Sequence, residues 1–155
     1  LGPEGERTVP LTGFHRLPGE NPDQDTVIRP GELITQVVLP PPAPGAASRY
    51  RKARDRASFA FALVSVAATL RVEAGRVEHA TLAFGGVAHR PWRARRAEVE
   101  LRGAPATPAV FQHALIAELA EARPLRDNAF KVDLARRLAL DVLGELTARQ
   151  PARTG

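Results

Sequence analysis

One lysine stands inside a cluster of arginines, in the stretch SRYRKARDRASF at residues 48–59. The chain has 22 basic residues, and only Lys52 and Lys131 are lysines. A lysine ammonium is a compact donor that reaches a carbonyl oxygen or a ring nitrogen where the planar guanidinium fork of arginine does not fit. Lys52 is therefore a candidate ligand contact, and the alternative is that it is an ordinary surface cation.

The four histidines do not form a recognisable metal site. They are His15, His79, His89 and His113. None has a second histidine three or four residues away, the spacing that brings two ligands onto one helix face. We interpret His113 as a packing or surface residue and His15 as a structural residue of a loop.

The sequence contains no other familiar catalytic motif. No serine lies in a nucleophile-elbow pattern, and the absence of cysteine excludes disulfides, thiolate metal sites and cysteine nucleophiles. Gly85-Gly86 lacks a phosphate-binding consensus, so we expect a turn at the end of a strand. Trp92 follows Pro91 and is expected to anchor the core. The chain is therefore not expected to be catalytically competent alone.

Length and composition are typical of one globular domain with a single core. The chain has 155 residues, of which 44% are apolar and 25% are charged. The net charge of +5 suggests nucleic acid, but the arginines are dispersed and only 5% of residues are aromatic, so we expect no nucleic-acid partner. The longest apolar run, Phe59–Leu70, is too short to span a bilayer, which needs roughly 20 residues. We expect no membrane partner either.

The first half of the chain predicts an extended segment followed by strands. Residues 1–31 are rich in proline and glycine and predict an extended strap. Glu32–Leu39 is rich in β-branched residues between Pro-Gly and three prolines, which predicts a strand. Residues 49–54 predict a second strand. Residues 61–73 and 76–84 predict a hairpin closed at Ala74-Gly75, although the alanine content of residues 59–70 also allows a buried helix.

The second half of the chain predicts helices. Trp92–Leu101 suits a short helix, and Thr107-Pro108 supplies the cap and first residue of a helix that runs to about Ala122. A last helix runs from a cap at Asp127 or Asn128 to about Arg149, with an apolar residue at every fourth position. The sequence therefore predicts an α+β fold, in which an antiparallel sheet of three or four strands is followed by three helices packed on one face.

Five ordered segments resemble the carboxy-terminal domain of the FAD-binding subunit of molybdenum hydroxylases. That family includes xanthine dehydrogenase, carbon monoxide dehydrogenase and aldehyde oxidoreductase. The sequences of these segments are most similar to the aldehyde oxidoreductase branch. The matching segments are FHRLPG at 14–19, PGELIT at 30–35, YRKARDRASFA at 50–60, LAFGGVAHRPWRA at 82–94 and NAFKVDLARR at 128–137.

The resemblance implies a cofactor and two contact residues. In the complete subunit Lys52 would reach the flavin of FAD, and Ile34 would pack against it as an apolar wall. A cation at the N1–O2 edge of a flavin stabilises its reduced anion. The plain alternative for Ile34 is a core residue of a strand. No catalytic residue and no metal ligand are implied for this chain.

The resemblance also implies partners and a division of the chain. The expected partners are the N-terminal FAD-binding domains, a molybdopterin subunit and an iron–sulfur subunit, so that electrons pass from molybdenum through iron–sulfur clusters to FAD and then to an external acceptor. Residues 1–31 would be the remnant of the preceding FAD-binding domain, 32–150 the carbon monoxide dehydrogenase flavoprotein C-terminal-like domain, and 151–155 a disordered tail. We expect a cytoplasmic location, or a periplasmic one if the protein is exported with a partner subunit.

Two other functions stay open at this point. The domain could be a non-catalytic module that docks partner subunits through its basic strand and its helices. It could also be a basic domain that binds nucleic acid, which salt-sensitive binding to arbitrary DNA would reveal.

Overall fold

The computed structural model describes residues 1–19, 21–56 and 58–149. The chain divides into two compact units, Leu1–Pro42 and Ala43–Gly155. The first unit contains one short 3-10 helix, η1 (Leu11–Gly13), and none of its described residues is buried. The second unit holds the buried core. The predicted tail at 151–155 lies outside the described residues.

The second unit is built on a four-stranded antiparallel sheet. Its strands are β1 (Ala47–Ala53), β2 (Val64–Glu73), β3 (Arg76–Gly85) and β4 (Trp92–Arg93), in the spatial order β1-β2-β3-β4. The β2–β3 hairpin closes at Ala74 and Gly75, which both have positive φ (47° and 74°), as the tight turns of twisted hairpins require. The strand predicted for residues 61–73 is therefore confirmed over the helical alternative, although it begins at Val64.

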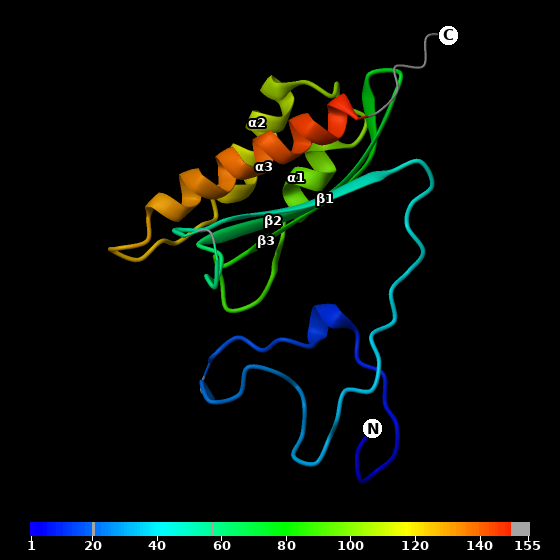
Figure 1. The fold of residues 1–155 in the computed structure, drawn as a ribbon, viewed down its shortest axis with the longest axis vertical. Coiled ribbons are helices and arrows are strands. Elements are labelled where there is room, and N and C mark those ends of the chain that lie inside the picture. Colours follow the sequence, from blue (N-terminus) through cyan, green and yellow to red (C-terminus); the bar gives the residue numbers. More distant parts are fainter. Residues whose placement is uncertain (20, 57, 150–155) are drawn as a thin grey trace. The chain divides into compact units, whose positions relative to one another are not determined.

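Three helices cover one face of this sheet (Figure 1). They are α1 (Arg95–Leu101), α2 (Pro108–Leu119) and α3 (Phe130–Ala148). The cap of α2 is the one predicted, because Thr107 Oγ1 accepts a hydrogen bond from Val110 N at 3.4 Å. The core between sheet and helices includes Val64, Val66, Leu70, Leu82 and Phe84 of the sheet and Leu115, Ala139, Val142, Leu143 and Leu146 of the helices. The predicted α+β class is confirmed.

The predicted strand at Glu32–Leu39 is wrong. All eight residues are described, and the structure places none of them in a strand. Leu33, Val37 and Val38 are each at least 70% exposed, because the segment has no neighbouring strand to pair with. A segment rich in β-branched residues forms a strand only when a neighbouring strand supplies backbone hydrogen bonds and cross-strand side-chain contacts.

Two helix boundaries also differ from the prediction. The helix expected from Trp92 begins at Arg95, because Trp92 and Arg93 pair with Phe84 and Ala83 as β4. The last helix begins at Phe130, and Asn128 does not cap it, since its side chain accepts a hydrogen bond from Leu125 N at 2.7 Å. Among the described residues, no helix is long and apolar enough to cross a bilayer.

Candidate functional site

Strand β1 presents different chemistry on its two faces. Arg49 and Arg51 point toward the helices, where both form ion pairs with Glu145 of α3. Side chains alternate along a strand, so Tyr50 and Lys52 lie on the opposite face of the sheet. Both are exposed, Tyr50 by 62%. Lys52 therefore belongs to the face that the helices leave open.

The open face is nearly flat beside Lys52. In the strand register Lys52 lies opposite Ser65 of β2, which lies opposite Gly85 of β3. A Cβ atom on Gly85 would collide with Ser65 Oγ unless that hydroxyl rotated away, so the glycine and the serine lie in close contact across the strands. Within the part of the chain that the structure describes, the Lys52 ammonium has no hydrogen bond or ion pair. The Lys52 ammonium is therefore an unpaired donor beside Ser65 and Gly85, whose small side chains leave space for a flat ring system to pack on the sheet.

The next row across the same face is similar. Tyr50 lies opposite Ala67, which lies opposite Ala83, which pairs with Arg93 of β4. These residues line a shallow hollow of about 380 Å³ whose floor is alanine and threonine and whose rim carries Tyr50 and Arg93. The open face is thus a smooth floor with polar groups at its edges.

Ile34 lies in the first unit. It is 55% exposed and lines a mainly apolar cavity of about 380 Å³ together with Val9, Leu11, Phe14 and Val38. Ile34 is therefore not a core residue of a strand. Ile34 belongs to the first unit and Lys52 to the second.

An ion pair braces the first unit next to this cavity. Arg7 donates from Nε and Nη2 to the two carboxylate oxygens of Glu32, each at 2.6 Å, and the amide of Arg29 donates to Glu32 Oε2 at 2.8 Å. The hydrogen bonds from the Arg7 guanidinium, followed by that from Arg29, lower the pKa of Glu32 to about 2. The carboxylate stays ionised and holds two distant parts of this unit together.

The second lysine has a structural role that the sequence did not indicate. Lys131 Nζ donates to the carbonyl oxygen of Gly86 at 2.9 Å and ties the start of α3 to the turn after β3. Gly86 has φ of 74°, and a Cβ there would lie 2.9 Å from Leu63 O. The prediction of a strand-end turn at Gly85-Gly86 is confirmed. Lys131 is engaged within the fold and Lys52 is not.

Two carboxylates that sequence reasoning missed hold the second unit together. Glu145 of α3 binds the two arginines of β1, and Glu118 of α2 accepts hydrogen bonds from Trp92 Nε1 at 2.7 Å and from Ala97 N at 3.0 Å. Glu118 thereby supplies the amino end of α1 with an acceptor. No local signal could reveal either carboxylate, because their partners lie 21 to 96 residues away.

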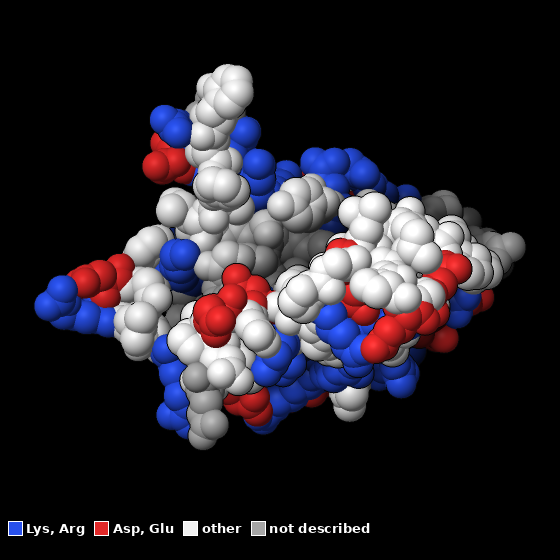
Figure 2. Space-filling model, turned by 90° about the horizontal axis from the view of Figure 1, so that it is seen from below, with Lys and Arg blue, Asp and Glu red and all other residues white. Residues whose placement is uncertain are grey.

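The histidines do not gather into a metal site. No group of three or more histidine, aspartate or glutamate side chains that could hold a metal ion occurs in residues 1–19, 21–56 and 58–149. His15 pairs with Thr26 in an isolated bridge, and its ring contacts that of Phe14 edge-on at 5.2 Å. On the face shown in Figure 2, basic side chains are interspersed with acidic ones.

The fold and the sequence define the family. Residues 48–146 match the CO dehydrogenase flavoprotein C-terminal domain, and the chain belongs to that family. It is 45% identical to the aldehyde oxidoreductase FAD-binding subunit PaoB of Escherichia coli over 152 residues, which are 96% of this chain and 44% of PaoB. It is 33% identical to the glyceraldehyde dehydrogenase medium chain of Sulfolobus acidocaldarius over 99 residues, which are 64% of this chain and 33% of that protein.

A solved structure agrees with this assignment. Carbon monoxide dehydrogenase from Hydrogenophaga pseudoflava superimposes with a TM-score of 0.83 at 28% identity, covering 97% of this chain and 52% of that chain. The predicted family and fold are therefore confirmed. The chain spans about half, or less, of the length of the relatives it matches.

Proposed function

We propose that this chain forms the carboxy-terminal part of the FAD-binding subunit of a molybdopterin-dependent oxidoreductase of the aldehyde oxidoreductase and xanthine dehydrogenase type. The relatives named as FAD-binding subunits support this proposal. The observation that carries it is the unpaired ammonium of Lys52 beside the flat row formed by Ser65 and Gly85. In the complete protein this row would lie against the flavin ring.

The donor chemistry of the chain fits a flavin. Bound FAD would supply the redox chemistry, taking electrons from iron–sulfur clusters and passing them to an external acceptor. Lys52 would donate to the flavin edge and stabilise negative charge there, which makes the flavin easier to reduce. Ile34 would exclude water as an apolar wall. Tyr50, on the same face as Lys52, is positioned to border the same site.

The proposal extends to partners and location. The complete protein would work with a molybdopterin subunit and an iron–sulfur subunit, and residues 1–31 would belong to its preceding FAD-binding domain. We expect a cytoplasmic location, or a periplasmic one if the protein is exported with its partners. The chain alone would carry no complete catalytic site.

The test is a redox titration of the complete subunit with FAD bound. Lys52→Ala should lower the flavin reduction potential, because the reduced anion loses a nearby positive charge. A unit charge roughly 4 Å away is worth about 4 kcal/mol at an effective dielectric of about 20. A solvent-screened remnant of about 1 kcal/mol corresponds to roughly 20 mV for a two-electron couple.

Two further variants serve as comparison and control. Lys52→Arg should recover part of the shift, since the wider guanidinium cannot occupy the same point. Arg95→Ala removes an exposed cation from α1 and should leave the potential unchanged. If the Lys52→Ala subunit retains FAD at the wild-type potential, Lys52 is an ordinary surface cation and the proposed contact is wrong.

A further inference from the structure

Ser65 of β2 carries a buried hydroxyl group without a hydrogen-bond partner. It is 9% exposed, and it is one of two buried polar side chains among the described residues, the other being Glu118. Glu118 accepts hydrogen bonds from Trp92 and from Ala97. The Ser65 hydroxyl makes no hydrogen bond in the described part of the chain. Buried polar groups of folded proteins are nearly all hydrogen-bonded, so an unpaired one indicates a partner that binds separately.

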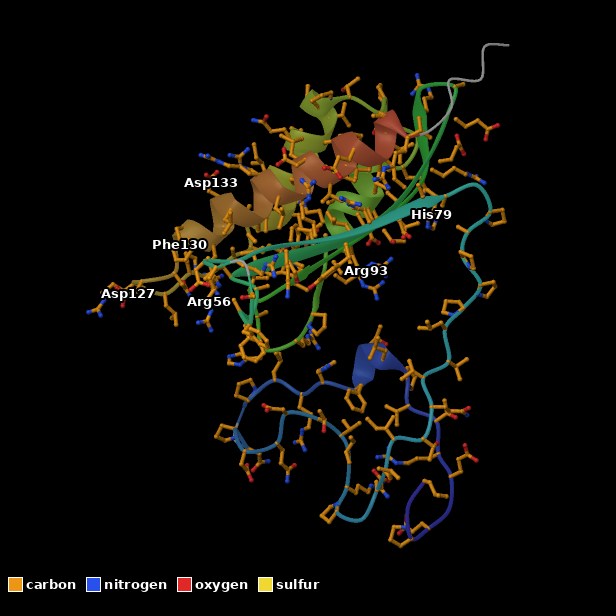
Figure 3. All side chains as sticks on the ribbon, in the orientation of Figure 1. Arg56, His79, Arg93, Asp127, Phe130 and Asp133 are labelled. Atoms are coloured by element: carbon orange, nitrogen blue, oxygen red, sulfur yellow. The ribbon has the colours of Figure 1, made fainter. Side chains whose placement is uncertain are left out.

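This hydroxyl faces the side of the sheet that the helices leave open. Val64 and Val66 are fully buried against the helices, and side chains alternate along a strand, so Ser65 between them points the other way. Figure 3 shows Arg93 of β4 on the same open side of the sheet. The Ser65 hydroxyl is therefore directed toward the open face and away from the core.

The space that the hydroxyl occupies depends on Gly85. The strand register places Ser65 between Lys52 of β1 and Gly85 of β3. A Cβ atom on Gly85 would lie 2.4 Å from Ser65 Oγ, so the hydroxyl fills the space that a side chain at position 85 would take. Gly85 does not have a positive φ, so its backbone conformation does not itself favour glycine. The glycine is therefore matched to the serine hydroxyl beside it.

We propose that Ser65 is a second flavin contact, whose hydroxyl donates a hydrogen bond to a carbonyl oxygen of the flavin ring. This inference rests on the proposed function, because it adds a donor to the site of Lys52. Opposite residues of an antiparallel pair have their Cβ atoms about 4.5–5.5 Å apart, so one ligand can contact both side chains. The two carbonyl oxygens of a flavin are acceptors, and a serine hydroxyl can donate to either.

The two donors would have different roles. Lys52 has a long, exposed side chain with several rotatable bonds and a charge, so it would mainly stabilise negative charge on the ring. Ser65 has one rotatable side-chain bond and is already buried, so a hydrogen bond from it costs little side-chain entropy. Ser65 would therefore mainly fix the position of the flavin ring on the sheet.

The first test compares the complete subunit with and without FAD. In the FAD-free protein Ser65→Ala removes an unpaired hydroxyl, so the Tm should stay the same or rise. In the loaded protein the same change removes a hydrogen bond, and the Kd of FAD should rise by about 3–10-fold. The increase in Tm that FAD gives should therefore be smaller in this variant than in the wild type.

Infrared difference spectroscopy of the bound flavin tests the contact itself. A carbonyl group that loses a hydrogen bond vibrates at a higher frequency, so one flavin C=O band should move upward in Ser65→Ala. Ser65→Cys keeps the size of the side chain and a weak donor, so its band should move part of the way. Gly85→Ala keeps the serine but displaces its hydroxyl, so the same band should move upward.

Ser48→Ala is the matched control. Ser48 lies on the same strand face as Lys52 but four residues away, opposite Thr69 of β2, and it is exposed. The substitution removes the same chemical group from the same side of the sheet. It should leave both the Kd of FAD and the flavin carbonyl bands unchanged.

The possible failures of this inference and of the proposed function can be told apart. If Ser65→Ala keeps the wild-type Kd and carbonyl bands while Lys52→Ala lowers the flavin potential, the Ser65 contact is wrong and a buried water satisfies the hydroxyl. If Ser65→Ala lowers the Tm equally with and without FAD, or fails to fold, the serine serves the fold and not the flavin. A complete wild-type subunit that binds no FAD would contradict the proposed function itself.

Discussion

Glu118 is a buried carboxylate on which two other elements depend. It is 5% exposed, and its two oxygens accept hydrogen bonds from the indole of Trp92 and from the first turn of α1. A buried donor that loses its acceptor costs roughly 1–3 kcal/mol. Glu118→Ala leaves two such donors and should lower the free energy of unfolding by about 2–4 kcal/mol.

Urea unfolding followed by circular dichroism measures this effect. Glu121→Ala removes an exposed carboxylate one turn away on the chain and is the matched control, with an expected change below about 0.5 kcal/mol. Glu118→Gln keeps one acceptor oxygen and should lie between the two. A Glu118→Ala protein as stable as the control would show that water satisfies both donors.

At the scale of elements, two glycines with opposite surroundings can be compared. Gly86 follows the last residue of β3 and has φ of 74°, and a Cβ there would meet the backbone oxygens of Leu63 and Ala62 at 2.9 and 3.2 Å. Gly144 lies inside α3, and a Cβ there would meet nothing within 4 Å. Glycine inside a helix is less favourable than alanine by roughly 0.5–1 kcal/mol.

The two alanine variants should therefore change stability in opposite directions. Gly144→Ala should raise the free energy of unfolding by about 0.5–1 kcal/mol. Gly86→Ala should lower it by more than about 1 kcal/mol, because the backbone oxygens cannot move away from the new methyl group. Thermal unfolding of both variants beside the wild type is the measurement, and a shift of the same sign in both would contradict this account.

The sequence predicted those elements whose signals are local. Ala74-Gly75 closes a hairpin between alternating strands, and Thr107-Pro108 starts a helix, so both could be placed from a few neighbouring residues. Glu32–Leu39 carries an equally strong strand signal but has no partner strand. Sequence also placed Trp92 in a helix, because its pairing with Phe84 depends on the sheet.

In the candidate site, too, some features could be predicted from the sequence and others depend on the folded structure. Lys52 was singled out by its residue type among arginines, and its exposed, unpaired position agrees with a contact role, which stays a prediction. The unpaired hydroxyl of Ser65 could not be predicted, because its surroundings depend on which residues of β1 and β3 lie beside it. The acceptor role of Glu118 depends on the packing of α2 against α1, which no local pattern encodes.

At the scale of the whole molecule, the two units differ in what stabilises them. The second unit has a buried core, whereas the first has no buried residue in its described part and is held by backbone hydrogen bonds and by ion pairs such as Arg7–Glu32. The pKa of Glu32 is lowered from an ordinary value of 4.5 to about 2. A lowered carboxyl pKa stabilises the fold fully above the ordinary value, and this contribution is lost as the pH falls toward the folded value.

The first unit should therefore loosen between about pH 4.5 and about pH 2. Carbon-detected NMR should give a titration midpoint near 2 for the Glu32 carboxyl, and the amide signal of Arg29 should change over the same range. Glu32→Gln should remove that response of the Arg29 amide. A Glu32 midpoint near 4.5 would show that the ion pair does not hold in solution.

Helix α3, the last element, packs on β1, the first strand of the sheet. During translation β1 is therefore synthesised well before the helix that covers it. Glu145 and its partner Arg51 are 94 residues apart, and α3 packs on β1 and β2. A ribosome adds about 5–20 residues per second, so the finished β1 waits on the order of 5–20 s for α3. During that interval the apolar side of the growing sheet is uncovered. Stalling or premature release before α3 would leave that side open to chaperones and to aggregation.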